Sequence, residues 1–463
     1  MKRILFLPLF FAFAAIAGAQ EAPQKVAAAD DRYKADILVV VTHPDDEAGT
    51  TPYLARAIDL EHRRVAVVFG TRGGSGSNQA GREQAAALAD EREIEARRAC
   101  AALGITNVWF LSGKDTASQN VLQSLANWGH GAALEQLVRL VRLTRPEVIL
   151  THFPGVLIGE NHGDHQATGV LATEAFDLAG DPAAFPAQLA GPTKRLEPWL
   201  ENLRPWQAKK IYYASDASDE SLFKGKGPAY SVKDLSPARK LAYWRIALES
   251  FRAHETQAKG FIDSLAKMSE ADIEKRYASS EDGWGESLQF VFGKALVGGS
   301  VTGDIFEGIT PGPIAFVPRA GGPAKSPAGV SVELGGPWSF YREFLHAHGL
   351  EHLPQAETPE IAVQAGGALQ VPLWVRNATG AAQEVTLTGT VPQGWSVTSG
   401  AGRYSVPAGD AAALRIEISV PGLSPSGQAP KEASEITVRA EANGQTAGTV
   451  RLRVALRKRA LPQ

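Results

Sequence analysis

The sequence has little of three things, and each shortage narrows its class. It contains one cysteine, Cys100, so no disulfide can form within the chain. Its formal net charge is −3, which leaves no overall basic surface of the kind that nucleic-acid binding needs, and no nucleic-acid partner is expected. Beyond the N-terminal segment no stretch is apolar enough to span a bilayer, so the mature chain is expected to have no transmembrane segment.

Residues 1–19 have the pattern of a cleavable signal peptide. Lys2 and Arg3 precede an apolar run over residues 4–16, and the small residues 17–19 follow it. The run is too short to span a bilayer stably. We therefore expect cleavage near Ala19 and export of the mature protein to the periplasm or the extracellular space.

A length of 463 residues indicates two or three domains. In residues 34–300, short β-branched runs first alternate with longer helical patterns, which is typical of βαβ units around a parallel sheet. This predicts an α/β domain with a Rossmann-like sheet flanked by helices. The expected strands are 37–41, 65–69, 108–111, 148–151 and 211–213, and the expected helices are 48–61, 82–103, 120–144 and 165–178.

The rest of the chain changes character twice. Residues 216–300 look helical and are expected to wall part of the cleft of the α/β domain. Glycine and proline recur over residues 301–358, which predicts an irregular connector. Over residues 359–458 apolar and polar positions alternate between turn signals, which predicts an all-β, immunoglobulin-like sandwich.

Two short motifs carry the residue types of a metal site. His43-Pro44-Asp45-Asp46-Glu47 directly follows the first predicted strand, and His162-Gly163-Asp164-His165 follows the fourth. Ligands of open α/β sheets bind at the carboxyl ends of the strands, so both motifs are expected at one edge. Imidazole and carboxylate ligands that leave one position open allow a metal ion to activate water at neutral pH. At the start of a helix, His43 and Asp46 can face one point while Asp45 leans away and stays free as a base.

These motifs resemble those of the PIG-L/LmbE family of zinc-dependent N-deacetylases, over roughly residues 34–260. The resemblance implies hydrolysis of an N-acetyl group on a glucosamine-type sugar or glycoconjugate. It implies zinc bound by His43, Asp46 and His165, with Asp45 as general base. It also implies that His162 polarises the carbonyl or acts as an acid, and that Glu47 and Asp164 support the ligands. The family usually has proline where this chain has Gly163, which is expected to loosen that turn.

The resemblance extends less specifically to substrate contacts and to the C-terminal module. Arg72, Arg82 and Asp115 are the nearest candidates for gripping sugar hydroxyls, and a segment beginning at His254 is a candidate border of the cleft. The turn at residues 392–395 and the run 406–409 resemble immunoglobulin-like modules of the NPCBM-associated kind. Two roles stay open for this module: binding of a polysaccharide or cell-surface glycan, and simple spacing from a surface.

Several alternatives remain open from the sequence. His and Asp ligands suit zinc but also other divalent ions. A zinc amidase acting on a non-sugar or thiol-conjugate amide is a second interpretation, and a non-catalytic glycan-binding protein with a deacetylase-like fold is a third. His346, His348 and His352 form a competing group of metal-ligand types, but no carboxylate pattern accompanies them, which favours a solvated surface.

Overall fold

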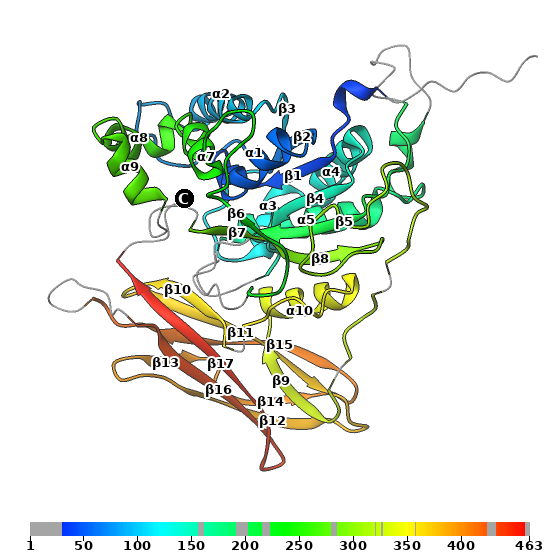
Figure 1. Cartoon of the computed structure of the whole chain (residues 1–463). Coiled ribbons are helices and arrows are strands. Elements are labelled where there is room, and N and C mark those ends of the chain that lie inside the picture. Colours follow the sequence, from blue (N-terminus) through cyan, green and yellow to red (C-terminus); the bar gives the residue numbers. More distant parts are fainter. Residues whose placement is uncertain are drawn as a thin grey trace, which may run out of the picture.

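The structure, a computed structural model, describes residues 30–155, 162–190, 202–214, 223–278, 285–319, 321–325, 327–356, 358–423 and 432–458. The predicted signal peptide lies outside these ranges. Figure 1 shows a helix-flanked sheet and, below it, a second part built from strands. Among the helices in the described ranges, none has the length and apolar character needed to cross a membrane.

The larger sheet has six strands in the order β3-β2-β1-β4-β5-β8. Its strands are β1 (Ile37–Val41), β2 (Val65–Phe69), β3 (Asn107–Phe110), β4 (Val148–His152), β5 (Lys210–Ala214) and β8 (Val291–Ala295). The first five run parallel and β8 runs antiparallel at the edge. The strand order reverses between β1 and β4, where Val39 lies opposite Leu150. Ligands of such sheets bind at this switch point, outside the carboxyl ends of the strands.

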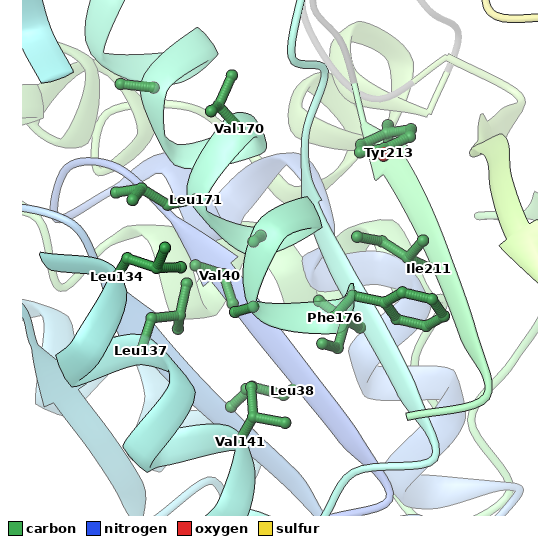
Figure 2. Close-up of a cluster of buried hydrophobic side chains, with 14 of the residues drawn as sticks. Leu38, Val40, Leu134, Leu137, Val141, Val170, Leu171, Phe176, Ile211 and Tyr213 are labelled. Carbon is green, nitrogen blue, oxygen red and sulfur yellow. The ribbon is translucent and has the colours of Figure 1, made fainter. Parts of the chain in front are cut away.

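Helices cover both faces of the sheet, which confirms the predicted α/β class. Side chains of successive strand residues point to opposite faces, so Leu38 and Val40 join one apolar cluster while Ile37 and Val39 join the other. The first cluster packs under α3 (Val121–Trp128), α4 (His130–Thr144) and α5 (Gly163–Leu178), and the second under α1 (Thr51–Asp59), α2 (Ala86–Leu103) and α7 (Tyr243–Phe251). Figure 2 shows side chains of α4 and α5 meeting those of β1. Full burial of one such side chain stabilises the fold by about 1.5–3 kcal/mol.

One helix is predicted over residues 120–144, but the structure has two. Helix α3 ends at Trp128, and its C-cap residue Gly129 has a φ of 64°, which lies in the left-handed region. Its backbone N–H donates to the carbonyl of Ala126, and α4 begins at the next residue. Glycine adopts this conformation without a Cβ penalty, which makes it a common helix end.

The helical prediction for residues 216–300 is correct only in part. Helices α7, α8 (Glu255–Leu265) and α9 (Glu270–Tyr277) pack together around a small apolar cluster that includes Trp244. The same region also contains β6 (Ala229–Ser231) and β7 (Ser287–Gln289), which pair with each other, as well as β8. Such short strands gain their stability from tertiary pairing, so local patterning gave little sign of them.

Residues 301–358, predicted as an irregular connector, contain regular structure that belongs to both parts of the molecule. Strand β9 (Val330–Leu334) pairs with β11 of the sandwich. Helix α10 (Pro337–His348) buries Phe344 and Leu345 in the apolar cluster of the α/β domain, and Figure 1 shows it between the two parts. Gly336, with a φ of 59°, and Pro337 at the first helical position begin this helix, a position that proline tolerates well.

The C-terminal part consists of two packed sheets. Their strand orders are β10-β17-β16-β12-β14 and β13-β15-β11-β9. The strands are β10 (Glu360–Gln364), β11 (Ala368–Asn377), β12 (Gln383–Thr390), β13 (Ser396–Ser399), β14 (Gly402–Val406), β15 (Ala411–Ser419), β16 (Ser434–Ala442) and β17 (Gln445–Arg457). Pairing is antiparallel except between β10 and β17. Alternate residues of these strands fill one apolar core, as the sequence pattern predicts.

Candidate active site

The chain turns sharply after β1 and brings the side chain of Asp46 back over His43. The Oδ2 atom of Asp46 accepts the backbone N–H of His43 at 2.6 Å, and the backbone N–H of Asp46 donates to the His43 carbonyl at 3.1 Å. A short 3-10 helix, η2 (Asp46–Gly49), then leads into α1. Asp45 stands before η2 with a φ of 122°, which residues with a Cβ rarely adopt. The backbone is therefore strained at Asp45, the predicted general base.

The second motif begins helix α5 on the neighbouring side of the switch point. His162 caps this helix, because its Nδ1 atom accepts the backbone N–H of Asp164 at 3.2 Å. The backbone N–H of Gly163 donates to the Ser118 carbonyl at 2.7 Å, and a Cβ at this position would lie 2.9 Å from that oxygen. The expectation that glycine loosens the turn is wrong, because this glycine is held by a hydrogen bond and by close packing.

Three imidazoles converge on one oxygen of Asp46. Its Oδ2 atom lies 3.3 Å from Nδ1 of His43, 3.4 Å from Nε2 of His165 and 3.4 Å from Nε2 of His152. The rings of His152 and His165 stack with centroids 4.3 Å apart. The structure thus brings the two sequence motifs together, and it adds His152 at the end of β4.

Within the described residues, two groups of three side chains have the spacing needed to hold a metal ion: one is His43, Asp46 and His165, and the other is His43, His162 and Asp164. The groups use different nitrogens of His43, since Nδ1 faces Asp46 and Nε2 lies 3.6 Å from Oδ2 of Asp164. Asp164 is fully buried, and its Oδ2 atom also accepts the backbone N–H of Thr116 at 2.7 Å. One oxygen of its carboxylate, Oδ2, therefore contacts both His43 and the loop before α3.

The donor set of the first group fits a small divalent ion. Zinc takes His nitrogen and Asp oxygen ligands at about 2.0–2.2 Å in a tetrahedron, whose edges are then about 3.3–3.6 Å long. The two contacts of Asp46 Oδ2 to His43 and His165, at 3.3 and 3.4 Å, match such edges. A carboxylate that holds the far nitrogen of a ligand histidine, as Asp164 does for His43, is a common support of metal sites.

The pKa values of His43 and Asp46 are shifted in opposite directions. Burial opposes protonation of His43, but hydrogen bonds to Asp164 and Asp46 outweigh it and raise the pKa of His43 to about 9. Burial would raise the pKa of Asp46, but the charge of His165 and its hydrogen-bonded histidines hold that pKa well below the usual range. Asp46 is therefore a carboxylate at neutral pH and can act as a ligand.

The pKa values of Asp45 and His162, which lie beside His43, Asp46 and His165, are also shifted in opposite directions. Burial and the neighbouring Asp46 carboxylate raise the pKa of Asp45 to about 7. Burial and the nearby charges of His43 and His165 lower the pKa of His162 to about 4. A carboxyl group that titrates near neutral pH is suited to take up a proton during a reaction, whereas His162 is neutral.

Glu47 belongs to neither group of possible ligands, of which His43, Asp46 and His165 are called the metal group from here on. Its side chain supports the loop on the buried side. Its Oε2 atom accepts the backbone N–H of Asp45 at 3.1 Å, and its Oε1 atom lies 2.6 Å from Nε2 of His254. Both side chains are almost fully buried. The segment beginning at His254 thus reaches the site through Glu47, and only Gln257 of that segment lines the cleft.

A polar cavity of about 280 Å³ opens above the metal group. Its walls beyond the metal group include Ser77, Arg92, Asp115, Thr116, His162 and Gln257. Asp115 also accepts the backbone N–H of Ser75 at 2.7 Å. The Arg92 guanidinium donates to the carbonyls of Gly73 at 2.6 Å and Ser77 at 3.0 Å, so it fixes the glycine-rich loop that forms one wall. This volume is close to the roughly 300 Å³ at the low end of small-molecule sites.

The other two predicted substrate residues do not line this cavity. Arg72 pairs with Asp90 and, at 2.9 Å, with Glu93, both on helix α2. Arg82 is exposed, and it lies outside the cavity lining. Of the three sequence candidates, only Asp115 faces the cavity.

The sequence-based reasoning missed His152 and Arg92. A usable signal exists for His152, because it directly follows the predicted strand 148–151 at the same sheet edge as His43. Arg92 gives no such signal, since it stands among other charged residues of a helix and only the packing of α2 against the loop singles it out. His348, predicted to be solvated, is 5% exposed and bonds to Asp177 at 2.6 Å, so it joins α10 to α5 instead.

The site is that of an α/β protein with a His/Asp cluster able to hold a metal ion. The profile of the PIG-L family, described as GlcNAc-PI de-N-acetylase, matches residues 38–176. Two similar proteins are named as 1D-myo-inositol 2-acetamido-2-deoxy-alpha-D-glucopyranoside deacetylases. The one from Thermobifida fusca is 27% identical over 48% of this chain and 82% of its own length. The one from Frankia alni is 30% identical over 48% of this chain and 86% of its own length.

Among solved structures, an N,N'-diacetylchitobiose deacetylase from Pyrococcus horikoshii aligns with 57% of this chain and 85% of its own, at 18% identity and a TM-score of 0.38. The chain belongs to the PIG-L family of de-N-acetylases.

Proposed function

We propose that this protein hydrolyses the N-acetyl group of a glucosamine-type sugar or glycoconjugate with the help of a divalent ion, most simply zinc. One observation carries the proposal: His43, Asp46 and His165 form one group of possible metal ligands, and Asp45 lies beside that group in the wall of the polar cavity, which His43 and Asp46 also line. The names of the similar proteins support an N-acetylated sugar as substrate.

His43, Asp46 and His165 would hold the ion. A bound ion of this kind supplies Lewis acidity, polarising a carbonyl and lowering the pKa of water from 15.7 to about 7. The three side chains are 13–16% exposed, so the site is largely shielded from bulk solvent, and the polar cavity reaches it at His43 and Asp46.

Asp45 takes the part of general base. Its carboxylate lines the cavity, and the backbone conformation at φ 122° directs it separately from its neighbour Asp46. With a pKa near 7 it can accept a proton from the attacking water and later release it to the leaving amine. Glu47 and His254 hold this conformation from the buried side.

His162 takes the part of oxyanion donor. Its Nδ1 atom accepts the Asp164 N–H, so Nδ1 carries no proton and the neutral ring carries its proton on Nε2. A neutral imidazole with this tautomer can donate one hydrogen bond to a developing oxyanion. The same bond disfavours a doubly protonated ring, which argues for carbonyl polarisation over proton donation by His162.

Two further parts of the proposal concern the whole chain. Export is supported by the basic and apolar pattern of residues 1–19, and fractionation of cells that produce the full chain, with immunodetection of the shortened protein, tests it. The C-terminal part, with its two packed β-sheets, is the part of the chain to which we assign a glycan-binding role. Retention of the inactive full chain on insoluble polysaccharide tests that role, and absence of retention would leave a spacer.

Two neighbouring substitutions test the proposed roles with matched chemistry. Asp45→Asn and Asp46→Asn each replace one carboxylate by an isosteric amide. We expect Asp45→Asn to keep the ion and lose about 10²–10⁴-fold in turnover of N-acetylated glucosamine compounds, the usual weight of a general base. We expect Asp46→Asn to lose the ion as well. Metal content and free-amine release measure both, and normal turnover by Asp45→Asn would refute the assignment.

A further inference from the structure

A second cavity, of about 240 Å³, lies beside the metal group. It shares Asp45 and Asp46 with the polar cavity, but its other walls come from different elements. Val41 at the end of β1, Ala214 at the end of β5 and Leu288 of β7 contribute apolar surface to it. Asp45 and Asp46 thus form a wall that the two cavities share.

The two cavities differ in chemistry. The polar cavity is lined by Arg92, Asp115 and His162, which suit hydroxyls and an amine. Among the described residues, the lining of the second cavity contains no lysine or arginine, and its only carboxylates are the two shared aspartates. Thr50, Thr151, His152, His165 and Gln289 also line it, so it is less charged than the polar cavity but not purely apolar, and it suits an uncharged group.

The substituents of an amide also differ in chemistry and point apart. The carbonyl carbon that is attacked must lie beside the metal group, so the amine and acyl sides extend in opposite directions from there. His162, the proposed oxyanion donor, lines only the polar cavity, and His165 lines only the second one. Since the polar cavity suits the sugar, the second cavity is left for the acyl side.

We propose that the second cavity binds the acyl group of the substrate and that it admits straight acyl chains longer than acetyl. This inference rests on the proposed amide hydrolysis. A methyl group is close in size to a water molecule, whose share of liquid volume is about 30 Å³. A cavity of about 240 Å³ therefore has room for several methylene groups beyond an acetyl group.

Gly49 gives a way to close this cavity. It lines the second cavity, and a Cβ built on it meets no atom within 4 Å, so a side chain can extend into open space there. Gly131 on helix α4 also has open space around a Cβ and lies outside the lining of both cavities. Gly49→Leu and Gly131→Leu therefore form a matched pair of test and control.

The test compares N-acetyl, N-butyryl and N-hexanoyl glucosaminides by free-amine release from the metal-loaded full chain. Each buried methylene strengthens binding by about fourfold, so kcat/KM for hexanoyl is expected to equal or exceed that for acetyl. Gly49→Leu is expected to lower the hexanoyl-to-acetyl ratio of kcat/KM by more than tenfold. Gly131→Leu is expected to leave this ratio within twofold of the unchanged protein.

A second readout needs no variant. Free hexanoate is expected to inhibit the unchanged protein at least tenfold more tightly than acetate, because its chain occupies the second cavity. Hydrolysis of the acetyl compound without the hexanoyl compound, or equal inhibition by the two carboxylates, overturns this inference and leaves the proposed function intact. Failure to hydrolyse any of the three amides refutes the proposed function and the inference with it.

Discussion

Backbone strain at Asp45 predicts an unusual result, in which glycine is more stabilising than alanine at a proposed catalytic position. Asp45→Ala and Asp45→Gly both remove the carboxylate, but only glycine accepts the φ of 122° without strain. Strain of this kind costs about 1–3 kcal/mol. Glycine in turn costs about 0.4–1 kcal/mol through its freer unfolded chain. The mid-range values, about 2 and about 0.7 kcal/mol, leave Asp45→Gly more stable than Asp45→Ala by about 1.3 kcal/mol.

The exposed helical position Gln123 on α3 is the control, because there the order must reverse. In the interior of a helix, glycine is about 1 kcal/mol less favourable than alanine. Calorimetric unfolding with a chelator present measures all four variants, since a bound ion would add its own stabilisation. If Asp45→Ala unfolds at the same temperature as Asp45→Gly or above it, the backbone at Asp45 is not strained.

Three other predictions concern the surroundings of the site. His254→Ala leaves Glu47 buried without its partner and is expected to cost about 3–5 kcal/mol of stability. Burial lowers the pKa of His254, but the Glu47 carboxylate raises it by more. The pair therefore stabilises the fold fully below the unfolded pKa of about 6.5, and this stabilisation is lost as the pH rises through the folded pKa. A loss of stability in His254→Ala that is the same at all pH values would contradict this. Gly163→Pro removes the hydrogen bond to the Ser118 carbonyl and adds a clash with it. Urea unfolding is therefore expected to show a loss of about 1–3 kcal/mol in the free energy of unfolding. No loss would show that the turn tolerates proline. Phe344→Ala is expected to destabilise the α/β domain by about 3–5 kcal/mol although it lies in the predicted connector, and an unchanged melting temperature would mean that α10 is a separate unit.

Much of the α/β domain could be predicted from the sequence because its signals are local. The apolar runs at residues 37–41 and 65–69 coincide with β1 and β2, since strands buried on both faces must be apolar throughout. The two His/Asp motifs follow strands that meet at the switch point, and the structure brings them together. The alternating runs of the C-terminal region lie in strands for the same reason of local pattern.

The parts that could not be predicted depend on contacts between distant segments. The glycines and prolines before α10 look like those of a linker, and only the packing of Phe344 against the α/β core shows that they begin a docked helix. His348 gives the same lesson, because its partner Asp177 lies 171 positions away. Arg92 holds the glycine-rich wall through backbone carbonyls, which leave no mark in the sequence.

The location of a bound ion tests the central claim most directly. Crystals grown with zinc, measured at the zinc absorption edge, are expected to show one anomalous peak in contact with His43 Nδ1, Asp46 Oδ2 and His165 Nε2, and none on Asp45. A peak held instead by His43, His162 and Asp164, the other group with suitable spacing, would contradict the account, because it would occupy the proposed oxyanion donor.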